Sequence, residues 1–437
     1  MSIVEIVPNQ SLNGNIVVPG DKSISHRAIL MSCLVDEGCK ISNLNRGRDV
    51  LNTLGLAKAL GVKVNQTNTN SLYTDFDRKY PKDFIEARCG NSGTMARLGM
   101  GVVSGLGITV EFDGDESLRS RPMDRVVSPL SQMGAQFIKR DNNKLPIKVV
   151  PAKLKGIEIE GTRPSAQVKS AILFAGLNAE GKTTYSEAKA TRKHTEELFA
   201  LAKVPFVIGH SDSKYSVTIE GPIVPSGFEL NVPCDPSQAA FFVAGAILCN
   251  NSHITIENVY LGKERAGFLE VLKRMNANIL IESDKNEILP TGTLTASSSE
   301  LIATDIAADE VADLIDEIPI LAVCAAKAEG VSQFHGLSEL RVKETDRLAT
   351  ISEMLRDFGT KVSVFEDNLI IHGGRTGTEN PVEIDSHFDH RIAMSAAILA
   401  LSLKDSVDPI KIHDFECVET SYVGFQDDLS ALGVLND

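Results

Sequence analysis

The most regular feature of the chain is a helical segment that follows a short polar cluster and is apolar on nearly every face. These segments consist mainly of Ala, Gly, Leu and Ile. A helix that lacks a wide polar face is buried in a core. The pattern therefore predicts six buried helices, whose polar clusters begin at Ser25, Ser92, Ser165, Ser237, Glu317 and His390.

Amphipathic segments alternate with these helices, and each runs through a small or turn-forming residue into a β-rich stretch. These residues are Gly61, Gly134, Val204, Asn276, Gly359 and Gly433. They are 70 to 83 residues apart, and one sixth of the 437 residues is about 73. A fixed period of this kind indicates a repeated structural unit. The sequence predicts six units, each with strands, one buried helix and one amphipathic helix.

The alternation of short strands and helices places the fold in the mixed α/β (α+β) class. Two globules of three units each fit the usual size of a domain better than one body of 437 residues. No low-complexity or Pro/Gly-rich linker separates the halves. The boundary near residues 233–235 is therefore inferred from the count of units.

An acidic composition narrows the range of partners. The chain has 44 Lys and Arg against 58 Asp and Glu, a formal net charge of -14. Nucleic acids and anionic membranes bind net positive faces, so both are disfavoured. The seven cysteines include no C-x-x-C pair and indicate reduced thiols. The start of the chain has no signal-peptide pattern, so we expect a soluble, cytoplasmic protein.

The polar clusters have two interpretations. Ser, Asp and Asn at the front of a helix are N-cap residues, and for Ser237 and Gln238 capping and function remain equally open. Several clusters also contain cations, which oppose the helix macrodipole unless an anion lies between the cation and the helix end. These cations are Lys22, Arg27, Arg97, Lys169 and Arg391.

More basic residues lie in loops beside acids: Arg119, Arg121, Arg125, Arg192, Arg341, Lys343 and Arg347. The run at residues 341–347 is also typical of a solvated surface with local ion pairs. Taken together, the clusters predict several phosphate or carboxylate groups in a cleft that six helix ends face.

Other kinds of site are disfavoured. The lysines Lys22 and Lys169 are each followed by serine but lack the preceding glycine of a phosphate-binding P-loop. No G-x-G-x-x-G follows a strand-like run, and the nine histidines show no metal-ligand spacing. No cysteine has the context of a catalytic thiol. We expect His26 to be an ordinary hydrogen-bonded residue.

A series of motifs resembles the EPSP synthase (3-phosphoshikimate 1-carboxyvinyltransferase) family. In order they are VPGDKSISHRA, CGNSGT with Arg97, GDESLRSRPM, PSAQVKSA, TRKHTE, DEIPILA, LRVKETDRL and DHRIAM. They run from residue 18 to 394, and the closing TSYVGF extends the resemblance over essentially the whole chain. PSAQVKSA and DEIPILA resemble the bacterial subclass that includes inhibitor-tolerant members.

The resemblance implies a two-domain fold in which each domain has three βαβαββ units, an inside-out α/β barrel that closes over the substrates. Residues 21–235 would form one domain and carry most contacts to shikimate 3-phosphate. Residues 1–20 and 236–437 would form the other and carry the catalytic carboxylates and part of the phosphoenolpyruvate site. The acidic surface charge, rather than the resemblance, leads us to expect a soluble monomer.

The implied reaction transfers the enolpyruvyl group of phosphoenolpyruvate to the 5-hydroxyl of shikimate 3-phosphate, in the chorismate branch of aromatic amino-acid biosynthesis. It yields 5-O-(1-carboxyvinyl)-3-phosphoshikimate and phosphate, and it requires no metal or cofactor. By resemblance, Asp316 accepts the hydroxyl proton and Glu344 protonates carbon 3. A buried carboxyl beside substrate anions should have a raised pKa, which suits Glu344 as the acid.

The resemblance also assigns the binding residues. Lys22 contacts both substrates and takes part in catalysis. The other residues implied for shikimate 3-phosphate are Ser23, Arg27, Ser165, Ala166, Gln167, Thr191, Arg192, Asp316 and Lys343. Those implied for phosphoenolpyruvate are Gly93, Arg121, Gln167, Arg347 and Arg391. Arginine suits such sites because its planar fork meets carboxylates and phosphates bidentately.

The chain departs from the family pattern at three positions. Lys193 stands where the TRDHTE form has Asp, Thr420 where some members have Lys, and Val423 where TSFPGF has Pro. The first two put the details of phosphate contact in question. Gly93 stands where some inhibitor-tolerant relatives have Ala, which predicts sensitivity to glyphosate.

Two other functions compete with this assignment. UDP-N-acetylglucosamine 1-carboxyvinyltransferases share the fold and the donor, but they have a reactive cysteine in a mobile loop, and residues 114–122 contain none. A non-catalytic polyanion-binding protein is the other rival. The presence of Lys22, Asp316 and Glu344 together with three arginines argues against it.

Overall fold

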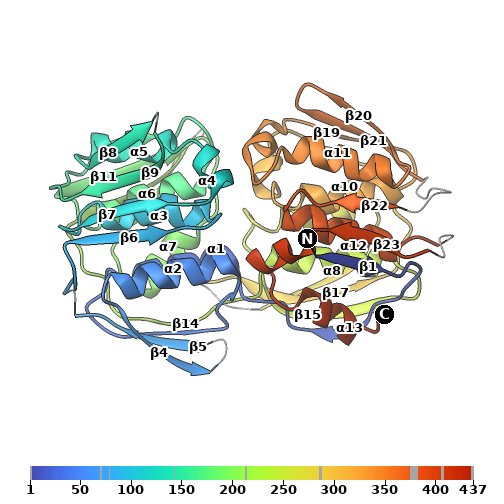
Figure 1. Ribbon diagram of the computed structural model, residues 1–437, viewed down its shortest axis with the longest axis horizontal. Helices are drawn as coiled ribbons and strands as arrows, with labels where there is room; N and C mark the ends of the chain where they lie inside the picture. The colour runs from blue at the N-terminus through green and yellow to red at the C-terminus, as the bar shows by residue number, and fades with distance from the viewer. Residues whose placement is uncertain are drawn as a thin grey trace. The chain divides into compact units, whose positions relative to one another are not determined.

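The chain forms two compact units in its computed structural model (Figure 1). The structure describes residues 2–68, 71–77, 79–141, 143–211, 214–284, 288–374, 382–404 and 408–434. Unit 1 comprises Met1–Pro19 and Pro233–Asp437, and unit 2 comprises Gly20–Val232.

Among the described residues, the strands form six small sheets, and five of these have four strands in the same arrangement. In the sheet β6-β7-β9-β8, the first two strands are parallel and are joined through a buried helix. The last two strands form an antiparallel hairpin, and β9 returns beside β7. A parallel pair needs a crossover connection, which the buried helix provides. Each repeat is therefore a βαβαββ module.

Unit 2 contains three modules. The first consists of β14 (Glu229–Asn231), α1 (Lys22–Ser32), β3 (Cys39–Ser42), α2 (Arg48–Ala59), β4 (Lys63–Asn68) and β5 (Ser71–Asp75). The second consists of β6 (Phe84–Arg88), α3 (Gly93–Val103), β7 (Thr109–Asp113), α4 (Glu116–Ser120), α5 (Asp124–Gln132), β8 (Gln136–Asp141) and β9 (Lys144–Val150). The third consists of β10 (Glu158–Glu160), α6 (Ala166–Gly176), β11 (Gly181–Glu187), α7 (His194–Leu201), β12 (Val207–Ser211) and β13 (Lys214–Gly221).

Unit 1 contains the other three. The first consists of β2 (Asn13–Ile16), α8 (Pro236–Leu248), β15 (His253–Tyr260), α9 (Gly267–Arg274), β16 (Asn278–Ser283) and β17 (Thr291–Ser297). The second consists of β18 (Asp305–Ile306), α10 (Ile318–Lys327), β19 (Val331–Phe334), α11 (Arg347–Asp357), β20 (Lys361–Phe365) and β21 (Asn368–His372). The third consists of β22 (Glu383–Asp385), α12 (His390–Leu401), β23 (Ile410–His413), α13 (Phe425–Ala431) and β1 (Ile3–Ile6). Short 3-10 turns occupy Val311–Asp313, Ser338–Val342 and Phe415–Thr420.

Three modules are completed by strands from distant parts of the chain. β14 pairs in parallel with β3, almost 190 residues earlier, at Leu230 and Ile41. β2 pairs in parallel with β15, and β1 pairs antiparallel with β23. The first 19 residues thus contribute two strands to unit 1.

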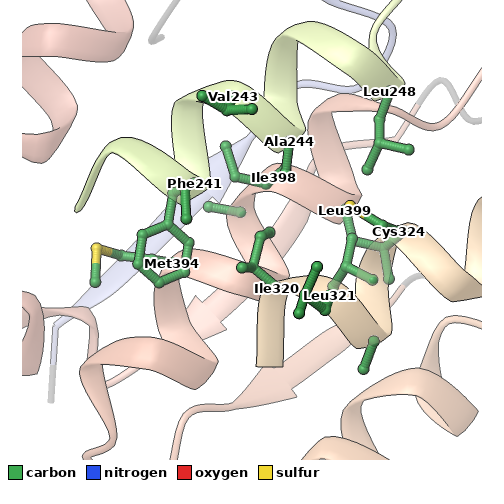
Figure 2. Packing of buried hydrophobic residues seen from close by; sticks show 14 of the residues in the cluster. Phe241, Val243, Ala244, Leu248, Ile320, Leu321, Cys324, Met394, Ile398 and Leu399 are labelled. Carbon is green, nitrogen blue, oxygen red and sulfur yellow. The ribbon is translucent and has the colours of Figure 1, made fainter. Parts of the chain in front are cut away.

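The six predicted buried helices are α1, α3, α6, α8, α10 and α12, and their cores are buried as expected. In unit 1, the helices α8, α10 and α12 pack against one another (Figure 2). Phe241 of α8, Leu321 of α10 and Ile398 of α12 are among the apolar side chains that fill this core. Burial of such a side chain contributes about 1.5–3 kcal/mol, so the helices are held by packing on all faces.

Two further observations concern the chain as a whole. All seven cysteines are buried, and none of them forms a disulfide in the structure. Within the part of the chain that the structure describes, no helix has the length and apolar character to cross a membrane.

Close packing of α3 on α6 in unit 2 depends on Gly101. A methyl group at this position would lie 2.2 Å from the carbonyl oxygen of Ala171 on α6, a backbone atom that cannot move alone. We expect Gly101→Ala to lower the free energy of unfolding by about 1–3 kcal/mol, the usual range for overpacking. Chemical unfolding followed by circular dichroism measures this change.

Gly55 of α2 provides the matched control for this prediction. A methyl group there would meet no atom within 4 Å. Gly55→Ala should raise the free energy of unfolding by about 0.5–1 kcal/mol, because alanine favours the helix and restricts the unfolded chain. Equal effects of the two substitutions would contradict the role given to the α3–α6 contact.

Candidate active site

The N-termini of the buried helices carry most of the polar residues that the sequence analysis identified. Side chains accept hydrogen bonds from backbone amides at five of these ends, as N-cap residues do. The capping residues are Asp21, Ser92, Ser165, Asp235 and Asp389. Because the helices are apolar elsewhere, these ends are where polar chemistry can be placed.

Ser237 and Gln238 do not cap α8, which Asp235 caps. The hydroxyl of Ser237 donates to Glu317, and the amide of Gln238 donates to the hydroxyl of Ser421 over 2.7 Å. Capping is therefore the wrong interpretation for these two side chains. They hold the start of α8 to neighbouring segments.

In unit 2, the start of α1 gathers Lys22, Ser23 and Arg27. Lys22 Nζ lies 3.3 Å from the Asp49 carboxylate. Arg27 is 2% exposed. Its guanidinium donates to the Ser170 hydroxyl over 2.9 Å and to the carbonyls of Ser23 and Ala166 over 3.0 and 3.4 Å. These hydrogen-bond partners are uncharged, although the carboxylates of Asp21, Glu196 and Glu197 also act on the charge of Arg27.

Arg192 lies beside this cluster, and its Nη1 is 3.4 Å from the Ser23 hydroxyl. Burial lowers the pKa of Arg27 to about 10, and the neighbouring positive charge of Arg192 adds to the effect. Two guanidinium groups that repel each other are stabilised by an anion bound beside both. The geometry thus supports an anion site at the start of α1.

The starts of α3 and α6 are linked by hydrogen bonds. Arg97 donates to the Gln167 side chain over 2.8 Å, and Gln167 donates to the Thr94 hydroxyl over 2.9 Å. Ser165 caps α6, and the Ala166 carbonyl accepts from Ser170 as well as from Arg27. The predicted residues of both helix ends therefore lie together within unit 2.

Gly93 opens α3 next to two arginines. A methyl group on Gly93 would lie 3.1 Å from Arg97 Nη1 and 3.6 Å from Arg121 Nη1. Arg121 donates to Asn91 over 2.7 Å and to Ser117 over 3.2 Å. Its Nε is buried and has no acceptor among the described residues. A buried donor without a partner indicates a group that a ligand satisfies.

Thr191 and Lys169 are held inside unit 2. The Thr191 hydroxyl donates to Glu187 over 2.9 Å. Lys169 is fully buried and pairs with Glu187 at 3.1 Å and with Glu196 at 2.7 Å. The inference that Lys169 faces a bound anion is therefore wrong. The macrodipole argument considered only the local sequence, whereas the two partner carboxylates lie on β11 and α7.

In unit 1, Arg347 is the centre of a buried charge network. Its side chain is 1% exposed and binds Asp389 through Nε at 2.7 Å. Its Nη2 lies 2.6 Å from the Glu344 carboxylate, and its Nη1 lies 3.7 Å from that of Asp316. Burial alone would lower the pKa of Arg347, but these carboxylates raise it above its usual value. Arg347 therefore remains charged.

Asp316 is held by further cations of unit 1. Lys343 Nζ lies 3.3 Å from its carboxylate, and Arg391 donates to its backbone carbonyl over 2.8 Å. The side chain of Asp316 is only 14% exposed. The structure thus brings together all the residues of this unit that the sequence analysis proposed for the site: Asp316, Lys343, Glu344, Arg347 and Arg391.

A second buried arginine, Arg265, joins the starts of α8 and α10. It binds Asp235 at 2.8 Å and Glu317 at 2.7 Å. Glu317 follows Asp316 directly in the chain and also accepts the hydroxyl of Ser237. The backbone next to Asp316 is therefore anchored on both helices.

Two other basic residues of the motifs lie on the surface. Arg341 pairs with Asp346 at 3.1 Å and with Asp367 at 3.0 Å, and Arg119 pairs with Asp113. The interpretation of a solvated charged surface is correct for Arg341. His26, in contrast, is buried, and its Nδ1 lies 2.7 Å from the Thr53 hydroxyl, which confirms an ordinary hydrogen-bonded histidine.

Known proteins are similar in sequence to this chain over nearly its full length. The family model for EPSP synthase (3-phosphoshikimate 1-carboxyvinyltransferase) matches residues 6–429. The 3-phosphoshikimate 1-carboxyvinyltransferase of Paramagnetospirillum magneticum is 40% identical over 433 residues, or 97% of this chain and 95% of the relative. That of Caldicellulosiruptor bescii is 40% identical over 435 residues, or 97% of this chain and 98% of the relative.

The chain belongs to the EPSP synthase family. Solved structures agree: an EPSP synthase from Acinetobacter baumannii matches with a TM-score of 0.85 at 34% identity, covering 100% of this chain and 99% of that chain. The enolpyruvyl transferase NikO from Streptomyces tendae shares the fold, with a TM-score of 0.76 at 15% identity. The EPSP synthase fold expected from the motifs is therefore confirmed.

The three departures from the EPSP synthase pattern have different settings. The Lys193 ammonium lies 5.6 Å from the centre of the Tyr215 ring, within cation–π range. The Thr420 hydroxyl donates to the Cys417 carbonyl over 2.7 Å and lies 3.4 Å from His390 Nδ1. Val423 is half exposed, and no described contact explains it in place of proline.

Three residues of these charge networks are not predicted by the sequence: Asp389, Glu187 and Arg265. Asp389 could have been found from the sequence, because it lies in the DHR motif. An acid that precedes two basic residues at a helix start can cap the helix and also pair with a cation. Glu187 ends a strand and Arg265 lies in a loop, where a single charged residue has no local signature.

Asp389 gives a prediction for the pH dependence of stability. Burial raises its pKa, but the charge of Arg347 outweighs this, and the pKa in the folded protein is lowered. A lowered folded pKa adds stability above the unfolded value of about 3.9, and this contribution is lost as the pH falls through the folded pKa. Asp389→Asn should lower the free energy of unfolding by about 3–5 kcal/mol at pH 7, because Arg347 loses a buried partner while asparagine still caps the helix.

Urea unfolding of the wild type and of Asp389→Asn between pH 7 and pH 3 measures this effect. The difference between their free energies of unfolding should narrow below about pH 4. Glu383 is the control, since hydrogen bonds from His413 and Lys411 lower its pKa on the exposed surface. Glu383→Gln should change stability little at any pH. A constant difference between wild type and Asp389→Asn down to pH 3 would refute the linkage.

Proposed function

We propose that Asp316 and Glu344 carry the two proton transfers of the carboxyvinyl transfer for which the family is named. The chain is a 3-phosphoshikimate 1-carboxyvinyltransferase of the shikimate pathway by its family membership. The observation that carries the assignment is the network of Arg347, in which one buried guanidinium lies within 4 Å of both carboxylates. An acid and a base held by one rigid group keep a fixed separation.

The first step is an addition. Asp316 takes the proton of the 5-hydroxyl of shikimate 3-phosphate while that oxygen forms a bond to carbon 2 of phosphoenolpyruvate. Glu344 gives a proton to carbon 3, so the methylene becomes a methyl group. General acid and base groups of this kind each contribute about 10²- to 10⁴-fold to the rate.

The second step is an elimination. Carbon 3 of the tetrahedral intermediate returns a proton to Glu344, and the carbon–oxygen bond to phosphate breaks. Asp316 returns the hydroxyl proton to the departing phosphate oxygen, so both carboxyl groups regain their starting protonation states. Inorganic phosphate leaves, and the enol ether remains on the 5-oxygen. The cations around the site stabilise the negative charge that the phosphate carries away.

Glu344 must be protonated before the addition, although its carboxylate lies 2.6 Å from Arg347 Nη2. The carboxylate or phosphate of phosphoenolpyruvate competes for the same guanidinium. When the positive charge of Arg347 also pairs with the substrate, it stabilises the Glu344 carboxylate less. Glu344 then also lies beside a substrate anion. Both changes favour its protonated form, so substrate binding itself prepares the acid.

The binding roles follow the clusters of each unit. We assign Ser23, Arg27, Ser165, Ala166, Gln167, Thr191 and Arg192 of unit 2, with Asp316 and Lys343, to shikimate 3-phosphate. We assign Gly93, Arg121, Gln167, Arg347 and Arg391 to phosphoenolpyruvate, and Lys22 to both substrates and to catalysis. The uncharged partners of Arg27 and the unsatisfied Nε of Arg121 support anion binding at these positions. We further propose that the protein is a cytoplasmic monomer.

Release of phosphate from phosphoenolpyruvate and shikimate 3-phosphate tests the catalytic roles. Asp316→Ala and Glu344→Gln should each lower kcat by at least about 100-fold, the usual effect of removing a general acid or base. Arg341→Gln is the control from the same motif, because Arg341 is exposed and paired on the surface. It should leave kcat within about twofold. Near-normal turnover of either carboxylate variant would reject its role.

The choice of acceptor is tested in the same assay. With UDP-N-acetylglucosamine in place of shikimate 3-phosphate, the wild-type protein should release no phosphate above background. Release with this acceptor alone would favour the rival carboxyvinyltransferase.

Gly93 gives a prediction on inhibition. Glyphosate should inhibit the wild type, because the bare Gly93 leaves space beside Arg97 and Arg121. In Gly93→Ala, the new methyl would come within 3.1 Å of Arg97, and it should raise the half-inhibitory glyphosate concentration about tenfold or more. Dose–response curves at fixed phosphoenolpyruvate measure the shift. Equal curves would show that Gly93 does not determine sensitivity.

A further inference from the structure

A buried ion pair in unit 2 holds the loop that contains Thr191 and Arg192. Residues 188–193 connect β11 to α7 without regular secondary structure. Thr191 in this loop is 8% exposed. A buried backbone outside helices and sheets must find other hydrogen-bond partners. Here the partners are the side chains of Lys169 and Glu187.

All the polar groups of Thr191 engage this pair. Its amide donates to Glu187 Oε1 over 2.8 Å, and its hydroxyl donates to Glu187 Oε2 over 2.9 Å. Its carbonyl accepts from Lys169 Nζ over 3.0 Å. The position of Thr191 is therefore determined by two elements of unit 2, β11 and α6, through two charged side chains.

The pair is itself fixed in place. The side chains of Lys169 and Glu187 are 0% and 1% exposed. Lys169 also binds Glu196 of α7 at 2.7 Å and lies 5.2 Å from the centre of the Tyr215 ring. The Tyr215 hydroxyl donates to Glu196 over 3.2 Å. A buried ion pair is poor evidence for stability, because apolar residues of similar volume often serve as well. Its retention here is better explained by the geometry that it imposes.

Arg192 follows Thr191 directly and reaches Ser23 at the start of α1. Its guanidinium also acts on Arg27, the buried cation of that helix. Lys169 lies on α6, only three residues after Ala166, so the same helix carries both the pair and the proposed contacts at its start. A displacement of Thr191 would move the guanidinium of Arg192 away from this cluster.

We propose that Lys169 and Glu187 are positioning residues for Arg192, fixing Thr191 so that the guanidinium meets the phosphate of shikimate 3-phosphate. The inference rests on the proposed function of unit 2 as the binding surface for this substrate. The hydroxyl of Thr191 is bound by Glu187. Thr191 therefore contributes to substrate binding by orienting Arg192, the next residue in the chain.

Steady-state kinetics of Glu187→Gln test the proposal. The variant keeps the size of the side chain but removes the charge that binds Thr191 and Lys169. We expect the KM for shikimate 3-phosphate to rise about tenfold, in line with the loss of a charge-assisted hydrogen bond, while kcat and the KM for phosphoenolpyruvate change less than about twofold. The melting temperature is recorded for each variant.

The matched control is Glu160→Gln. Glu160 pairs with Lys214 at 2.8 Å in the sheet that contains β11, but both side chains are exposed. This variant should leave both KM values unchanged. A Glu187→Gln protein with a lower melting temperature and an unchanged KM would show a structural role only and would overturn the proposal.

A double-mutant cycle with Arg192→Gln decides whether the effect passes through Arg192. If it does, Glu187→Gln should raise the KM about tenfold in the wild type and less than about twofold in the Arg192→Gln background. Equal factors in both backgrounds would mean that Glu187 acts independently of Arg192, and the proposal would be wrong.

Thr191 provides a second test if Glu187→Gln does not fold. Thr191→Val keeps the shape but removes the hydroxyl, and it should raise the KM for shikimate 3-phosphate about threefold, whereas Thr191→Ser should restore it. An unchanged KM in Thr191→Val, with a raised KM in Arg192→Gln, rejects the proposal.

Calorimetric titration with shikimate 3-phosphate distinguishes a failure of the proposed function from a failure of this inference. A wild type that binds none of it overturns the proposed function and this inference together, whereas normal binding by both wild type and Glu187→Gln overturns this inference alone.

Discussion

The burial of the core helices on every face is the constraint on which the rest of the structure depends. A helix such as α8, with all its residues buried, offers no surface for polar side chains along its length. Its first amide groups still need acceptors. Polar residues are therefore confined to the helix starts, where they cap the amides. The positive end of the helix dipole also lies at the helix start, where it favours bound anions. In both units, part of the residues assigned to chemistry lies at these starts, such as Gln167 and Arg391, whereas others, such as Arg192 and Glu344, lie in the segments that connect the elements.

The two units solve the capping requirement differently, and this difference separates their roles. In unit 1, Asp235 and Asp389 cap α8 and α12, and the carboxylates require the buried arginines Arg265 and Arg347. Acids and bases fixed in such networks are suited to proton transfer. In unit 2, the neutral Ser92 and Ser165 cap α3 and α6. Asp21 caps α1, and the guanidinium of Arg27 on that helix is held by hydroxyls and carbonyls, which is an arrangement suited to receiving an anionic substrate.

The sequence was sufficient for features that depend on local pattern. The sequence predicts that α3 and α12 start near Ser92 and His390. An apolar run of helical length is stable only when it is buried, so the polar residue before it marks the helix start. Pairings between distant residues could not be predicted. The register of β14 on β3 is set by packing across almost 190 residues, and nothing near Leu230 encodes it. Lys169 was assigned to an anion site for the same reason. Its local setting at a helix start resembles that of Arg27, and only the fold brings Glu187 and Glu196 to it.

The net charge of -14 is compatible with a site for small anions, because the relevant cations are buried. Arg27 and Arg347 are 2% and 1% exposed, so protein atoms surround them and separate them from the surface. Over a screening length of about 8 Å at physiological salt, a large polyanion meets mainly the surface carboxylates. An anion small enough to reach the guanidinium groups exchanges its hydration for charge-assisted hydrogen bonds, which are strongest where water is excluded. Selectivity for small phosphorylated and carboxylated molecules thus follows from the burial of the arginines and does not require a positive protein.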